Sequence, residues 1–134
     1  MISADLIARI RHHTLSLTGF ACLAYALAAL ALGRPDPAPI WIPGALGVFA
    51  ALAITAAFAW APKAQAAMAD DELTQAQVGR ALRIGYWVAV FLYPIFGLMQ
   101  FVGLVDWPTA FAAMGTLTGA AYLLPLTWLQ GWRA

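Results

Sequence analysis

The strongest constraint on this chain is a set of four long segments that contain no Asp, Glu, Lys or Arg. They cover residues 14–32, 44–61, 84–105 and 109–130. As α-helices rising about 1.5 Å per residue, segments of this length extend over about 27–33 Å, close to the ~30 Å hydrocarbon core of a bilayer. The pattern predicts an all-α integral membrane protein. We expect an up-down-up-down four-helix bundle that forms a single transmembrane domain over residues 1–134.

The overall composition supports the same fold class. Of the 134 residues, 63% are hydrophobic and 10% are charged, and a soluble domain usually carries about 25% charged residues. So few charges cannot cover a globule in water, but a lipid-facing exterior accepts apolar side chains. The net charge of +1, with seven Lys and Arg spread along the chain, also argues against a nucleic-acid partner. The expected partners are the lipid bilayer and either further copies of this chain, in a homo-oligomer, or another membrane protein.

The first apolar segment has one rival interpretation, a cleaved signal peptide. Arg9 and Arg11 precede the segment, and Ala29-Leu30-Ala31 offers the small residues that a signal peptidase accepts. The apolar stretch is longer than the core of a signal peptide, which is usually about 7–15 residues. We therefore expect a membrane-spanning helix here.

Short connections predict that the helices pair as antiparallel hairpins. Residues 33–39 contain three prolines, which exclude a helix and favour a stiff turn. Residues 104–108 form the second turn, where Asp106 is placed to cap the next helix and Pro108 suits its first turn. The connection between the two hairpins, residues 62–83, is longer and more polar.

An acidic cluster in this longer connection has the pattern of a helix start. Asp70, Asp71 and Glu72 precede a helix-favouring stretch, and acidic groups stabilise the N-terminal end of a helix dipole. The third long helix is therefore expected to begin near Asp71, outside the membrane. With Arg80 and Arg83, the three acids form a candidate cytoplasmic contact for a cation or a charged partner, the alternative being a solvated helix cap.

The distribution of basic residues predicts the orientation in the membrane. Arg34 lies in a hairpin turn, and the other Lys and Arg lie in the termini and the 62–83 connection: Arg9, Arg11, Lys63, Arg80, Arg83 and Arg133. The positive-inside rule then places both termini in the cytoplasm. Tryptophans, which favour the bilayer surface, fall near the predicted helix ends: Trp41, Trp60, Trp87, Trp107, Trp128 and Trp132. The expected location is the plasma membrane, the inner membrane of a bacterium.

Few residues offer chemistry. Residues 3–10 form an amphipathic segment expected at the membrane interface, followed by His12 and His13, whose side chains point about 100° apart on a helix and are poorly placed to share a metal. We expect solvated imidazoles there. Cys22 is the single cysteine and excludes an internal disulfide or a multi-cysteine metal site. No nucleophile, phosphate-binding loop or metal-ligand spacing is evident, so we expect no enzyme activity, cofactor or metal.

Two kinds of residue stand out within the spans. Gln100 is the most polar group, and its amide needs a partner in hydrocarbon, either another helix or, alternatively, a ligand or pore. Pro94 and Pro125 each remove a backbone donor and are expected to kink their helices, as hinges or as static bends. Tyr93, Pro94 and Gly97 together form a candidate cavity wall.

Small residues recur at every fourth position, a spacing that lets helices approach closely in lipid. One row runs along the second helix: Gly47, Ala51, Thr55 and Ala59. A second row runs along the third: Gly85, Ala89, Tyr93 and Gly97. The rows suit packing within the bundle or, alternatively, an interface with another chain. The candidate helix-packing or ligand-path residues are therefore Tyr93, Pro94, Gly97, Gln100, Gly115, Gly119, Tyr122 and Pro125.

Three functional interpretations remain open. The first is a non-enzymatic membrane protein that acts through helix–helix association, as an accessory, assembly or regulatory subunit. The alternative is a small homo-oligomeric transporter or channel whose path contains Tyr93, Pro94, Gly97 and Gln100. The third is a lipid- or quinone-binding protein that uses a cleft beside the proline kinks. The segment from Asp71 to Gln100 resembles small four-span bacterial membrane proteins with an Asp-Glu pair before the third helix, a resemblance that implies no activity.

Overall fold

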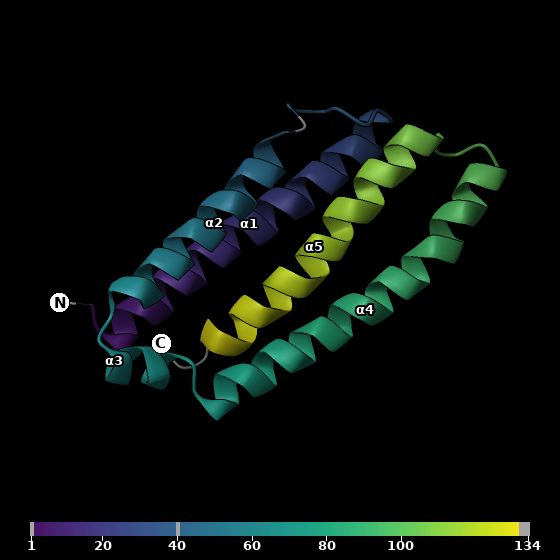
Figure 1. The fold of residues 1–134 in the computed structure, drawn as a ribbon. Coiled ribbons are helices and arrows are strands. Elements are labelled where there is room, and N and C mark those ends of the chain that lie inside the picture. Colours follow the sequence, from purple (N-terminus) through teal and green to yellow (C-terminus); the bar gives the residue numbers. More distant parts are fainter. Residues whose placement is uncertain (1, 40, 132–134) are drawn as a thin grey trace.

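The computed structural model describes residues 2–39 and 41–131, and over these ranges the chain is helical without strands (Figure 1). The helices are α1 (Ala4–Leu32), α2 (Trp41–Trp60), α3 (Lys63–Ala69), α4 (Glu72–Phe101) and α5 (Trp107–Gly131). Four of them, α1, α2, α4 and α5, are long and apolar enough to cross a membrane. The prediction of an all-α chain with four helices long and apolar enough to span a membrane is confirmed. Trp132 and Arg133 lie outside the described residues.

Side-chain caps stabilise the starts of three of these helices, α1, α4 and α5. Ser3 Oγ accepts the Leu6 N–H at 3.2 Å and starts α1 well before residue 14, so the amphipathic segment predicted at the interface is continuous with the first span. Asp71 Oδ1 accepts the Thr74 N–H at 2.8 Å and starts α4, as predicted. Asp106 Oδ1 likewise accepts the Thr109 N–H at 3.2 Å near the start of α5. Polar caps of this kind satisfy the backbone donors that a helix N-terminus leaves open.

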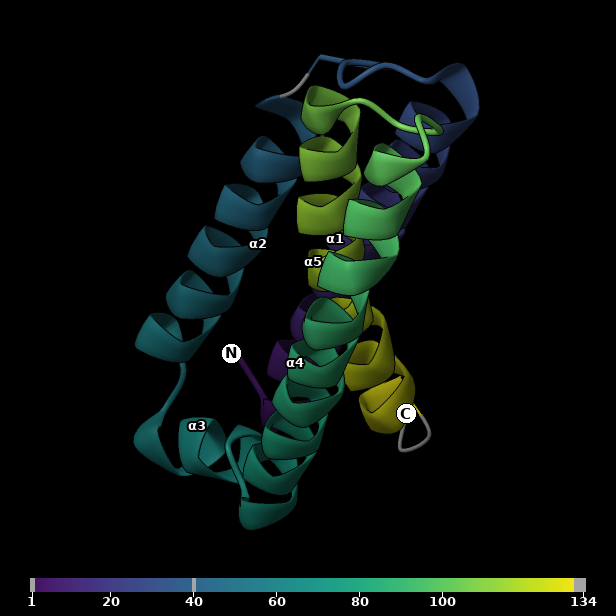
Figure 2. The same ribbon diagram turned by 90° about the vertical axis from the view of Figure 1, so that its right-hand side faces the viewer.

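The long helices form a row in which α1 and α5 are central. α2 packs along α1 on one side, and α4 packs along α5 on the other (Figures 1 and 2). Glycines permit the close approaches. A Cβ added to Gly19 would lie 3.1 Å from Leu123 Cβ of α5, and one added to Gly85 would lie 3.3 Å from Tyr122 Cβ. The first and last spans are therefore neighbours, although they are farthest apart in the sequence.

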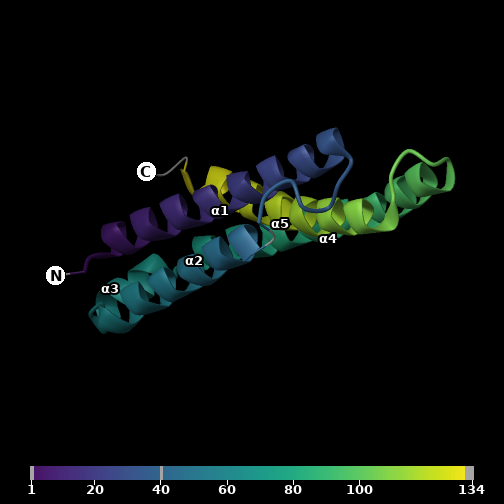
Figure 3. The ribbon, with the colours of Figure 1, turned by 90° about the horizontal axis from the view of Figure 1, so that it is seen from above.

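The short helix α3 closes the end of the molecule where α1 begins (Figure 3). Ile7 of α1 is fully buried in a cluster with Ala57 and Ala69. The Ala4 N–H donates to Gln65 Oε1 at 2.8 Å, which fixes the start of α1 against α3. α3 lies in the connection predicted for residues 62–83, and no helix is predicted at its position because seven residues are too few to show a clear periodicity.

Gly85→Leu is expected to destabilise the bundle, because the new side chain would meet Tyr122 where the two helices already touch. Overpacking of this kind typically costs about 1–3 kcal/mol. Gly97→Leu on the same helix is the matched control, because a Cβ there meets nothing within 4 Å. Unfolding by denaturing detergent, followed by circular dichroism, measures both. Equal stability of the two variants would contradict the α4–α5 contact.

Candidate functional site

One cavity, here called the central cleft, lies between residues of all four long helices and has a volume of about 350 Å³. α2 contributes a wall of three small residues, Gly47, Ala50 and Ala51, together with Ile54. No atom lies within 4 Å of the position that a Gly47 Cβ would take, so this wall is open. The cleft exists because α2 is held along α1 and does not pack closely against α4.

Polar groups line the end of the central cleft that is nearest α3. Both side-chain polar atoms of Gln130 are buried and lack a hydrogen-bond partner among the described residues. Arg11 Nη1 donates to the Ala69 carbonyl at 3.2 Å, but its buried Nε is unpaired within the same part of the chain. The carboxylates of Asp70 and Asp71 attract the Arg11 guanidinium. The Gln130 amide therefore keeps both an unmet donor and an unmet acceptor, buried beside the cleft.

Deeper in the cleft, the hydroxyl of Thr18 has hydrogen-bond partners. Thr18 Oγ1 donates to the Thr14 carbonyl at 2.8 Å within α1 and reaches the Leu46 carbonyl of α2 at 3.3 Å. This contact joins α1 to α2 near the cleft wall. Among the residues that line this cleft, the buried side-chain atoms without a hydrogen-bond partner in the described chain therefore belong to Gln130 and Arg11.

The candidate residues on α4 lie apart from both cavities. Tyr93 is 70% exposed, and Pro94 and Gly97 lie on the same open face of an uninterrupted helix. Gln100 is half-buried, and its amide makes no hydrogen bond with other described residues. A path lined by these side chains would have to be completed by a second chain, because the two cavities described here do not include them.

The candidates on α5 have different surroundings. Gly119 lies beside Cys22 of α1, whose sulfur would be 3.6 Å from an added Cβ, and Tyr122 meets Gly85 and lines the central cleft. Pro125 lines the second cavity. Gly115 has open space where a side chain would point. Of the two α5 glycines predicted to pack against another helix, Gly119 therefore lies at a helix contact and Gly115 does not.

The candidate cytoplasmic contact is only partly available to a partner. Asp71 caps α4, and Asp70 lies close enough to Arg11 to attract it. Glu72, Arg80 and Arg83 are exposed on the first turns of α4. The acidic cluster therefore acts, at least in part, within the fold.

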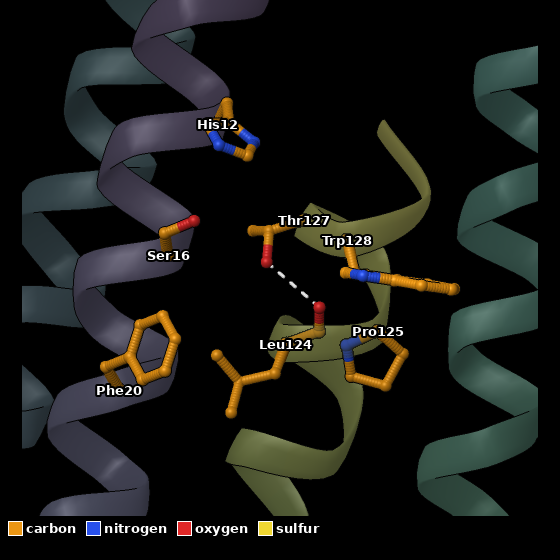
Figure 4. A pocket seen from close by; sticks show the side chains of 7 residues that line it. All are labelled: His12, Ser16, Phe20, Leu124, Pro125, Thr127 and Trp128. Atoms are coloured by element: carbon orange, nitrogen blue, oxygen red, sulfur yellow. Dashed lines mark hydrogen bonds between the residues drawn. The ribbon is translucent and has the colours of Figure 1, made fainter. Parts of the chain in front are cut away.

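The second cavity, here called the α1–α5 groove, has a volume of about 780 Å³ (Figure 4). It is lined by His12, Ser16, Phe20, Leu124, Pro125, Thr127 and Trp128. The Nδ1 atom of His12 is buried without a hydrogen-bond partner in the described chain. His12 is half-buried and lines the groove, whereas His13 is exposed, so the expectation of solvated imidazoles stays a prediction. The spacing of His12, Ser16 and Phe20, one helical turn each, was the signal that could have identified the groove.

Comparison of the chain with protein-family models, curated proteins and solved structures finds no match. What each cavity could hold therefore follows from its own residues. The central cleft combines small side chains with a buried unpaired amide, and the α1–α5 groove combines an imidazole with apolar walls.

Gln130→Met is expected to stabilise the isolated chain by about 1 kcal/mol or more, because it removes a buried amide that has no partner. Gln77→Met is the matched control, since Gln77 Nε2 donates to the Leu129 carbonyl at 3.2 Å and its loss should destabilise by about 1 kcal/mol. Detergent unfolding of the two purified variants measures the difference. Destabilisation by Gln130→Met would show that this amide is already satisfied in the isolated protein.

Proposed function

We propose that this protein is a non-enzymatic multi-pass membrane protein that acts by helix–helix association, as an accessory, assembly or regulatory subunit. Its four long helices cross the plasma membrane up-down-up-down, and both termini lie in the cytoplasm. The partner is a transmembrane helix of an unlike membrane protein, and the central cleft receives side chains from it.

The basic residues support this orientation. Arg9, Arg11 and Lys63 lie at or near the α3 end of the molecule, and Arg80 and Arg83 lie in the first turns of α4. Arg34 lies in the opposite connection, after α1. Cytoplasmic segments carry the excess of Lys and Arg, so the α3 end is the cytoplasmic one.

The central cleft is the observation that carries the proposed association. Lipid removes the usual hydrophobic gain between helices, so association depends on close packing and on interhelical hydrogen bonds. The cleft offers both, a wall of small residues on α2 and the unpaired amide of Gln130. A helix with its side chains is about 10–12 Å across, so the partner lies along the opening between α2 and α4 and inserts side chains into the cleft.

The association is tested by native mass measurement after extraction from its own membrane in a mild detergent or in nanodiscs. We expect the chain in a stoichiometric complex with an unlike membrane protein. A clean monomer would contradict the proposal, and a homodimer would favour the homo-oligomeric transporter or channel instead.

Gly47→Leu is expected to release this partner, because a Cβ at Gly47 meets no atom within 4 Å in the isolated chain and the longer side chain would occupy the cleft. Gly44→Leu on the same helix is the matched control, as Gly44 is equally open and lies outside the cleft lining. The measured quantity is the fraction of chain in the complex. Loss of the complex in both variants, or in neither, would contradict docking at the cleft.

The orientation is tested by cysteine labelling in a Cys22→Ala background. Asp36→Cys lies in the connection after α1, and Lys63→Cys lies at the first residue of α3. A membrane-impermeant maleimide added to right-side-out spheroplasts should label position 36 and reach position 63 only after lysis. Labelling of position 63 in intact spheroplasts would reverse the proposed sidedness.

A further inference from the structure

The α1–α5 groove changes from charged to apolar along its length. On α1, helical spacing places Arg9, His12, Ser16 and Phe20 on one face, in that order from the start of the helix. Arg9 is exposed, His12 and Ser16 are half-buried, and Phe20 is 62% exposed toward the outside of the bundle. This stripe therefore runs from a cation through hydrogen-bonding groups to an aromatic ring.

The opposite wall of the groove, on α5, also changes from polar to apolar. Thr127 lies across from His12 and Ser16, and Leu124 lies across from Phe20, whereas the Trp128 ring points away from α1 (Figure 4). Thr127 Oγ1 is satisfied by the Leu124 carbonyl at 2.9 Å, whereas the His12 ring and the Ser16 hydroxyl make no hydrogen bond within the described residues. The polar end of the groove is thus built around His12.

The polar end lies at the level of the lipid headgroups. His12 stands two residues before the apolar segment 14–32, and Trp128 lies in the last turn of α5 that the structure describes. Tryptophan favours the headgroup region, and the acyl chains begin below it. Phe20 and Leu124 therefore lie among acyl chains, and the groove opens sideways into the bilayer.

We propose that the α1–α5 groove is a binding site for an anionic phospholipid. The phosphate accepts hydrogen bonds from the His12 imidazole and the Ser16 hydroxyl, Arg9 attracts its charge, and one acyl chain lies along Phe20 and Leu124. This site shares no lining residue with the central cleft, so it does not depend on the proposed helix partner.

The charges around the groove favour an anionic headgroup over a neutral ring such as a quinone. Arg9 lies one turn from His12 and is exposed, so it can reach a phosphate at the mouth of the groove. Asp5 lies one further turn toward the start of α1, and no ion pair joins it to Arg9 among the described residues. A quinone would use His12 but would gain nothing from Arg9. The size of about 780 Å³ falls within the range of about 300–1,000 Å³ typical of small-molecule sites.

Native mass spectrometry of the purified chain tests the proposal with phosphatidylglycerol and phosphatidylcholine of identical acyl chains, each at limiting concentration, and with a quinone. We expect retention of one phosphatidylglycerol with about tenfold preference over phosphatidylcholine. Equal retention of the two lipids, or preferred retention of the quinone, would overturn the proposal.

Adjacent histidines provide the matched variants. His12→Leu should lower phosphatidylglycerol retention about tenfold, and His13→Leu should leave it unchanged, because His13 is exposed and outside the groove. Arg9→Gln alters an exposed side chain without disturbing the packing and should remove most of the preference for the anionic lipid. Circular dichroism confirms the folding of each variant. Wild-type retention in both His12→Leu and Arg9→Gln, or an equal loss in the two histidine variants, would contradict the site.

Discussion

The arrangement depends on the close approach of α1 and α5 at Gly19. At this point a Cβ added to Gly19 would lie 2.9 Å from Leu124 Cδ2, so the backbone of α1 lies almost in contact with the side chains of α5. Every other long helix joins this central pair, α2 through α1 and α4 through α5. Because lipid supplies no hydrophobic gain between helices, such close packing has to provide the attraction. The two cavities lie where this row of helices leaves the flanks of the central pair uncovered.

Local physical chemistry explains which features the sequence could predict. Spanning length follows from composition alone, and the caps at Asp71 and Asp106 follow from side chains that act within three residues. Helix-to-helix contacts are different, because a small-residue row shows which face is suitable but not which neighbour meets it. Gly85 touches α5, whereas Gly97 in the same row is open.

The groove around His12 shows the same limit for the candidate site. Adjacent histidines on a helix point in different directions, and only tertiary packing determines that His12 faces α5 while His13 is exposed. Gly19 makes that packing possible, but it does not belong to the predicted rows of small residues at every fourth position. Gln130 is the last residue of the fourth predicted span. Its burial at the cleft that Arg11 also lines depends on how all four long helices pack, which the sequence does not show.

The pairing of the first long helix with the last has a consequence for how the chain is made. During synthesis, the α1–α2 hairpin is complete long before the ribosome has released α5. Until then, the face of α1 that carries Gly19 is turned toward lipid or toward whichever membrane protein is nearby, including an insertion factor. The native bundle can therefore close only after translation reaches its final span, and a chain truncated before α5 would lack the surface on which α4 rests.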